Sequence, residues 1–218
     1  MKISGFYEKI YVVHWKPLKD RKEYLEKIFK DLGLNKMVVW VDQYESEKDV
    51  KDIKNPFNLN LKLLMVNMSH LFCYKDQLKN GYKNILILED DIDFEHLNVI
   101  AYLNQAAEEF QQLDGDIAFL STCCGLNVKN IKPPQLLYYN PNYITRCCGA
   151  YIVNKRCVEK LIECVINCHA IDRMLNALIP LINVRCLWSG HPIKQGSETG
   201  KYTSALLDIR DSDGNYTL

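Results

Sequence analysis

Four carboxylate side chains follow one short apolar run. The run, residues 84–88, has the sequence NILIL, and Glu89, Asp90, Asp91 and Asp93 come directly after it. In an open parallel sheet, ligands bind beyond the carboxyl ends of the strands. A hard divalent cation prefers oxygen ligands and shares its coordination with phosphate. The pattern therefore favours a divalent-cation site that also holds a diphosphate, whose growing charge the ion neutralises.

A second interpretation of the same carboxylates is purely structural. Asp93 or Glu95 stands where a helix over residues 96–113 begins. Acidic side chains accept hydrogen bonds from the free backbone N–H groups of a helix N-terminus. Charge alone leaves both interpretations open, and the apolar run directly upstream favours the metal.

The elements that must position these side chains alternate along the first half of the chain. Apolar runs predict strands at residues 9–15, 36–41, 84–88 and 116–120. Helical spacing of apolar residues predicts helices at 18–34, 59–81 and 96–113. Strand–helix alternation predicts an α/β fold with a mainly parallel central sheet and helices on both faces. The nearly continuous apolar strands agree with a sheet that is covered on both sides.

The second half is less regular. Strands are expected at 136–139, 149–154 and 183–189, and helices at 155–168 and 171–182, the latter broken at Pro180. The remainder is rich in Gly and Ser and is expected to be a flexible tail. With no repeat or low-complexity linker, the chain is interpreted as one domain over residues 1–218.

Composition excludes several classes of function. The 218 residues carry 27 basic and 27 acidic side chains, so charge gives no case for a nucleic-acid partner. No apolar stretch reaches the roughly 18 residues that a transmembrane segment needs. With no signal peptide and nine cysteines, we expect reduced thiols and a cytoplasmic location, in the host cytoplasm for a viral source. Cys164, Cys168 and His169 suggest a metal site, but buried helical cysteines are the commoner explanation.

Five stretches together resemble a known family. They are YVVHWKPLKDR (11–21), MSHLFCYKDQLKNGYKNILILEDDIDF (68–94), GAYIVNKRCVEKLI (149–162), AIDRML (170–175) and HPIKQGSETGKYTS (191–204). The chain resembles glycosyltransferase family 25, the lipooligosaccharide and collagen galactosyltransferase group. The Ser-His helix followed by Glu-Asp-Asp is the specific part.

The resemblance implies a GT-A, Rossmann-like nucleotide-sugar transferase fold. Its nucleotide-binding half would span about 1–120 and its acceptor-binding half about 121–204, with a tail at 205–218. It also implies a UDP-sugar donor, Mn²⁺ or Mg²⁺, inversion at the anomeric carbon, and a glycan or glycoprotein acceptor. The divergence of this compact chain from the family pattern would suit a bacterial or large-virus enzyme. The alternatives are an inactive nucleotide-sugar-binding module and a metal-dependent phosphatase or nucleotidyltransferase.

The resemblance also assigns roles to residues. Asp91 holds the last position of the Glu-Asp-Asp signature and is the expected metal ligand, with Asp93 as an alternative and His191 as a second ligand. Asp172 is the expected general base, although it is equally natural as the N-cap of the helix that follows it. The residues expected to bind the donor are Val13, His14, Asp42, Lys62, Glu89, Asp90 and Lys194. Lys194 and Lys201 belong to a segment that we expect to close over the diphosphate as a lid.

Overall fold

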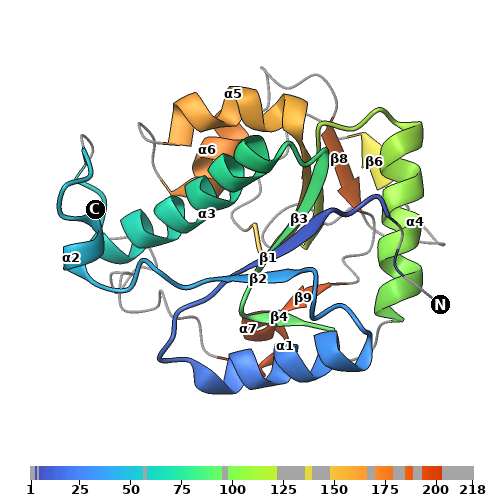
Figure 1. Cartoon of the computed structure of the whole chain (residues 1–218), viewed down its shortest axis with the longest axis horizontal. Coiled ribbons are helices and arrows are strands. Elements are labelled where there is room, and N and C mark those ends of the chain that lie inside the picture. Colours follow the sequence, from blue (N-terminus) through green and yellow to red (C-terminus); the bar gives the residue numbers. More distant parts are fainter. Residues whose placement is uncertain are drawn as a thin grey trace.

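The computed structural model describes residues 3, 5–55, 58–94, 98–121, 136–138, 148–165, 170–178, 185–188 and 193–202. Its centre is a seven-stranded sheet in the order β2-β1-β3-β7-β5-β8-β6, with helices packed on either side (Figure 1). The strands are β1 (Lys9–Val13), β2 (Val38–Val41), β3 (Asn84–Glu89), β5 (Ile117–Ser121), β6 (Leu136–Tyr138), β7 (Ala150–Asn154) and β8 (Arg185–Trp188). All seven lie within or overlap the expected apolar runs.

The sheet is mixed, and the expectation of a mainly parallel sheet is wrong. β1 runs parallel to β2 and to β3, and β5 runs parallel to β8. β7 is antiparallel to both β3 and β5, and β6 is antiparallel to β8. An apolar run indicates a strand that is buried on both faces, but it does not indicate the direction of that strand. The strand–helix alternation of the first half therefore does not predict that β7 is antiparallel.

Helices cover both faces of the sheet, as expected. They are α1 (Lys19–Asp31), α2 (Glu47–Val50), α3 (Leu61–Asn80), α4 (Val99–Gln112), α5 (Lys155–Val165), α6 (Ile171–Leu178) and α7 (Gly196–Thr199). One core contains buried side chains of α3, α5 and α6, and the other contains those of α1 and α4. Successive side chains of a strand point to opposite faces. Accordingly, Tyr11 and Val13 belong to the first core, whereas Ile10 and Val12 belong to the second.

The helix ends next to the carboxylates follow local signals. α3 ends at Gly81, whose positive φ of 73° suits glycine at a helix C-terminus. The side chain of Asn98 caps α4 by accepting a hydrogen bond from the N–H of Ala101. Asp93 lies in a strand, and Glu95 falls outside the described residues. The capping interpretation of Asp93 is therefore wrong, because Asn98 directly before the helix fills that role.

A late segment, residues 193–202, docks beside the carboxylates. Its strand β9 (Lys194–Gln195) pairs antiparallel with β4 (Ile92–Asp93), and helix α7 follows. Ile193 is fully buried in the core that contains α1 and α4. Part of the expected flexible tail is therefore an ordered neighbour of the Glu-Asp-Asp loop.

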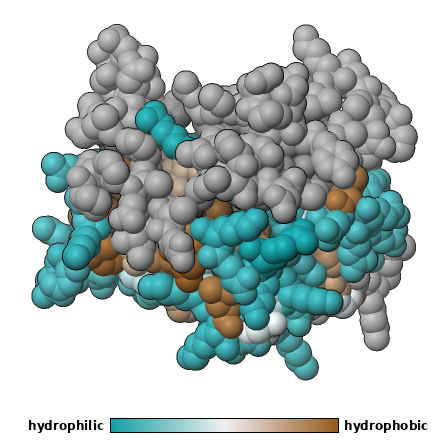
Figure 2. Space-filling model, turned by 90° about the horizontal axis from the view of Figure 1, so that it is seen from above, coloured by the Kyte–Doolittle hydropathy of each residue, from teal (hydrophilic) through white to brown (hydrophobic). Residues whose placement is uncertain are grey.

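The described surface is mostly hydrophilic on the face shown in Figure 2, with a few apolar residues between the polar ones. Trp15 and Leu61 are the large hydrophobic residues of the described part that are exposed. None of the described helices has both the length and the apolarity that crossing a bilayer demands.

Candidate functional site

The Glu-Asp-Asp loop leaves the sheet where three distant segments meet. Glu89 is the last residue of β3, and its N–H donates to the carbonyl of Gly149 at 2.7 Å. Beyond the turn, the N–H of Gly196 donates to the carbonyl of Asp91 at 2.5 Å. The loop is thus held by the residue before β7 on one side and by the late segment on the other.

Asp90 faces inward and forms a buried ion cluster. One of its oxygens lies 2.8 Å from His14 Nδ1, and the other accepts from the guanidinium of Arg21 at 2.8 Å. All three residues are buried. A buried carboxylate needs such partners to offset its desolvation, so the cluster ties the loop to the end of β1 and to α1. The donor-binding roles predicted for His14 and Asp90 stay predictions, and Arg21 holds the loop.

Asp93 is held by the late segment and α1. Its Oδ1 accepts from the hydroxyl of Tyr24 at 2.9 Å and lies 3.4 Å from Lys201 Nζ. The same ammonium group stands 3.5 Å from the centroid of the Tyr24 ring, a cation–π contact. Asp93 is buried. An oxygen already engaged by two donors is less available to an ion, and the metal role predicted for Asp93 stays an alternative.

Asp91 has the opposite environment. Its Oδ1 is a buried oxygen with no hydrogen-bond partner in the described part of the chain. The pKa of this carboxyl is raised from 3.8 to about 7, mainly by burial and also by the negative charges of Glu89 and Asp90. A cation at this oxygen would give the unpartnered atom a partner and would offset the repulsion from Glu89 and Asp90. These surroundings suit an ion, and the metal role of Asp91 stays a prediction.

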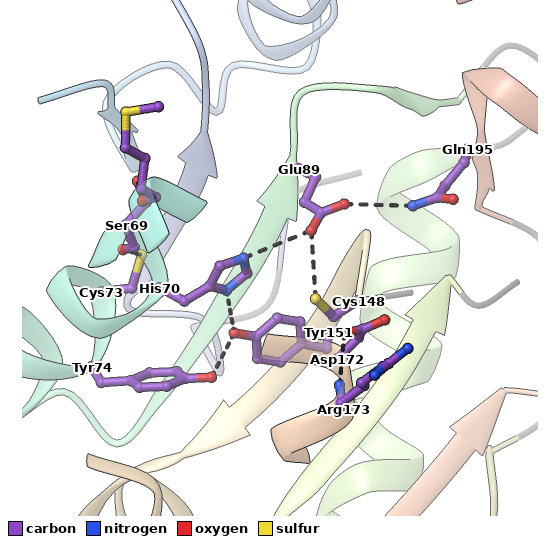
Figure 3. Close-up of polar contacts among 11 residues, drawn as sticks. Ser69, His70, Cys73, Tyr74, Glu89, Cys148, Tyr151, Asp172, Arg173 and Gln195 are labelled. Atoms are coloured by element: carbon purple, nitrogen blue, oxygen red, sulfur yellow. Dashed lines mark hydrogen bonds and ion pairs between the residues drawn. The ribbon is translucent and has the colours of Figure 1, made fainter. Parts of the chain in front are cut away.

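Glu89 is the centre of a polar cluster drawn in Figure 3. Its Oε1 lies 3.8 Å from His70 Nε2 and 3.5 Å from Cys148 Sγ. Its Oε2 lies 3.5 Å from the amide nitrogen of Gln195. These neighbours come from α3, from the segment before β7, and from β9.

Gly149 makes room for this arrangement. A Cβ added at Gly149 would lie 3.0 Å from Nε2 of Gln195 and 3.4 Å from the hydroxyl of Ser121. A contact as close as 3.0 Å would force the neighbouring side chain to move. The glycine therefore allows Gln195 to approach Glu89.

Asp172 is buried in the first turn of α6 and accepts from the N–H of Arg173 at 2.7 Å. Its pKa is raised from 3.8 to about 6, mainly by burial, which outweighs the lowering by the bond from Arg173 and is reinforced by the charge of Glu89. At neutral pH the group is ionised but holds a proton more readily than a free carboxylate, as a general base should.

The other residues predicted from the sequence are spread around the loop. Val13 ends β1, and Asp42 follows β2 near Lys16 and Lys22, at 4.0 and 3.7 Å. Lys62 lies in the first turn of α3, and Lys194 is exposed on β9 opposite Asp93. His191 lies outside the described residues. The roles of these residues stay predictions. Glu89 and Asp172 lie close enough for the charge of Glu89 to raise the pKa of Asp172.

Three members of the cluster are not among the residues predicted from the sequence. Cys148 has no predicted role, and His70 appears only within the Ser-His helix of the family resemblance. Gln195 lay in the expected tail. The signal that could have found Cys148 and Gln195 is their place beside Gly149 and Gly196, two glycines that allow close approach to the loop.

Comparisons with known proteins establish the family of the chain. The model of glycosyltransferase family 25 (LPS biosynthesis protein) matches residues 7–175. A search of curated proteins found no significant match. Among solved structures, the chain is similar to the crystal structure of mannose-1-phosphate geranyltransferase from Thermus thermophilus. The alignment has a TM-score of 0.42 and 9% identity, and it covers 87% of this chain and 74% of that one. Because the family model spans well over half of the chain, from β1 into α6, this protein belongs to glycosyltransferase family 25 and is a transferase.

Proposed function

We propose that the chain is a metal-dependent, inverting GT-A glycosyltransferase. It moves a sugar from a nucleotide-sugar donor, a UDP-sugar, to a hydroxyl of a glycan or glycoprotein. The observation that carries the proposal is a pair of carboxyl groups, that of Asp91, whose Oδ1 is buried, and that of the buried Asp172. Both have raised pKa values, and both feel the charge of Glu89 at the end of β3.

The surroundings of Asp91 fit a divalent ion. Its unpartnered Oδ1 and the neighbouring charges of Glu89 and Asp90 form an oxygen-rich, negative environment. Mn²⁺ and Mg²⁺ bind through one or two carboxylates and complete their shells with water and phosphate oxygens. Asp91 would hold the ion, with Asp93 and His191 as further candidates. The ion would supply charge neutralisation at the leaving diphosphate.

Asp172 is suited to accept the proton of the acceptor hydroxyl. An effective general base has a pKa close to the working pH, and burial brings this carboxyl to about 6. Its hydrogen bond from the Arg173 N–H fixes the side chain at the start of α6. Asp172 therefore combines a fixed position with a proton affinity above that of an exposed aspartate.

The donor is expected at the neighbouring ends of β1 and β2. Val13 and Val41 are paired in register, so His14 and Asp42 follow at the same edge of the sheet. In open α/β sheets this edge is where ligands bind. The late segment, with Lys194 and Lys201, would cover the diphosphate and exclude water, which competes with the acceptor.

A screen of nucleotide sugars tests the proposal. The full chain is incubated with each UDP-sugar and Mn²⁺ or Mg²⁺, and release of UDP is measured with and without glycan acceptors. We expect metal-dependent release, abolished by EDTA and lowered in Asp172→Asn. UDP binding without any release would instead support the inactive binding module. Phosphate release from simple phosphomonoesters would support the phosphatase alternative.

A further inference from the structure

Three potential metal ligands of different chemistry converge beside the proposed active site. They are His70 Nε2 from α3, a carboxylate oxygen of Glu89 from β3, and Cys148 Sγ from the residue before Gly149 (Figure 3). These atoms all lie within 4.8 Å of one another. His70 and Cys148 are buried, whereas 24% of the Glu89 side chain is exposed. The group therefore has a buried side and one side that a small ligand can reach.

His70 is oriented as a metal-ligating histidine is. Its Nδ1 lies 2.7 Å from the hydroxyl of Tyr151, and that hydroxyl lies 2.7 Å from the hydroxyl of Tyr74. Its Nε2 is buried, points toward Glu89, and has no hydrogen-bond partner among the described residues. Metal-binding histidines typically hold one ring nitrogen by a hydrogen bond, which fixes the ring and presents the other nitrogen to the ion. The two tyrosines do this for His70.

Two of the separations are close to those between ligands of one ion. Glu89 Oε1 accepts a hydrogen bond from Cys148 Sγ at 3.5 Å, and it lies 3.8 Å from His70 Nε2, beyond the roughly 2.7–3.2 Å of a normal N–H···O bond. Tetrahedral zinc has bonds of about 2.0–2.3 Å, which place neighbouring ligand atoms about 3.3–3.6 Å apart. The sulfur–oxygen pair already matches, and the nitrogen–oxygen pair is slightly wider.

We propose that His70, Glu89 and Cys148 form a binding site for a borderline-soft divalent ion of the zinc class, with its fourth position open to water or a ligand oxygen. Thiolate and imidazole select such ions, whereas Mg²⁺ and Mn²⁺ favour oxygen ligands. Binding exchanges the proton of the Cys148 thiol for a metal–sulfur bond, and that proton passes to solvent. The site shares Glu89 with the surroundings of Asp91, but its nitrogen and sulfur ligands, His70 and Cys148, are distinct from them, and it does not depend on the proposed function.

Cobalt titration of the full, reduced chain tests the proposal. Co²⁺ in place of zinc should give a thiolate-to-cobalt charge-transfer band that saturates at one equivalent. Cys148→Ser should abolish the band. Cys157→Ser is the matched control, because Cys157 is equally buried and lies outside the group. Asp91→Asn should also keep the band. A band that survives in Cys148→Ser places the metal at other cysteines and overturns the proposal, as does the absence of any band in the wild-type chain.

Two further measurements keep the test decisive if Cys148→Ser folds poorly. X-ray absorption of the zinc-loaded wild-type chain should show one sulfur neighbour at about 2.3 Å with nitrogen and oxygen neighbours; a shell without sulfur rejects the site. Tyr151→Phe keeps all three ligands and removes the hydroxyl that holds His70. It should keep the cobalt band and weaken the affinity about 10- to 100-fold; an unchanged affinity contradicts the role of His70.

Discussion

Asp172 brings stability and catalysis into conflict. Its folded-state pKa of about 6 lies above the ordinary value of 3.8. A carboxyl with a raised pKa favours the folded state below pH 3.8, and this contribution is lost as the pH rises through about 6. A difference of about two pH units corresponds to about 3 kcal/mol. At neutral pH the ionised, buried carboxylate therefore destabilises the fold while it serves as a base.

Asp172→Asn tests both halves of that conflict. At pH 8 the variant should be more resistant to urea than wild type, by up to about 3 kcal/mol, because it removes a buried charge. Its turnover should fall about 100- to 10,000-fold, the usual contribution of a general base, while UDP binding persists. Asp52→Asn, at an exposed position, is the control and should change neither quantity. Normal turnover in Asp172→Asn would show that Asp172 is not the general base.

The pH profile of transfer should carry the signature of the same group. Because only the ionised form accepts a proton, kcat/KM should fall about tenfold for each unit of pH below about 6. The residual activity of Asp172→Asn should lack this limb of the profile. The measurement is the steady-state rate between pH 5 and 8. If the variant shows the same fall in kcat/KM at low pH, that fall belongs to another residue.

Asp91→Asn separates metal binding from folding. The folded-state pKa of about 7 means that ionised Asp91 destabilises the metal-free fold at pH 8. The variant should therefore unfold at a higher urea concentration without metal, yet lose Mn²⁺-dependent UDP binding. Calorimetric titration with UDP in the presence of Mn²⁺ measures the second effect. If the variant binds UDP with wild-type affinity in the presence of Mn²⁺, the ion is held by other ligands.

At the scale of elements, the late segment is held by close backbone contacts. A Cβ on Gly196 would lie 2.2 Å from Cδ2 of Tyr202 and 3.2 Å from the carbonyl of Asp91. Tyr202 follows Lys201, whose ammonium group contacts Tyr24 and Asp93. Gly196 therefore links the packing of α7 to the position of the Glu-Asp-Asp loop.

Gly196→Ala should loosen that link. The added methyl must displace Tyr202 or the loop, and overpacking of this kind costs about 1–3 kcal/mol. Hydrogen exchange should rise in residues 193–202 and 90–93 while the main sheet stays protected. Gly5→Ala is the matched control, because a Cβ at Gly5 meets nothing within 4 Å. Equal protection in the two variants would mean that the segment does not depend on this contact.

The elements themselves were largely predictable, and their directions were not. Apolar runs located β1, β2, β3 and β5, and helical spacing located α1, α3 and α4, because burial imposes these periods directly. The antiparallel direction of β7 depends on how the chain returns to the sheet. The two-residue strands β4 and β9 are too short to leave a period. Asp91 could be chosen from its motif, whereas the meeting of His70, Glu89 and Cys148 required the β3–β7 pairing.

At the scale of the whole molecule, donor and metal should stabilise the fold together. A ligand that binds only the folded state adds about 2.7 kcal/mol at 100 times its dissociation constant. We expect UDP with Mn²⁺ to raise the melting temperature, and either one alone to have little effect, because the diphosphate completes the ion's coordination. Thermal denaturation at several concentrations measures this. The same shift with UDP alone would argue against a metal-bridged diphosphate.

The antiparallel contact of β3 with β7 also affects the order of events during synthesis. Cys148 lies 59 positions after Glu89, and Gln195 lies 106 positions after it. Contacts between such distant positions form late, because a long loop must close first. While the ribosome is still translating β5, the emerging chain already contains the acidic turn and its partners His14, Arg21 and His70, yet Cys148 and Gln195 have not been made. The polar cluster around Glu89 is therefore complete only after residues 193–202 have been synthesised.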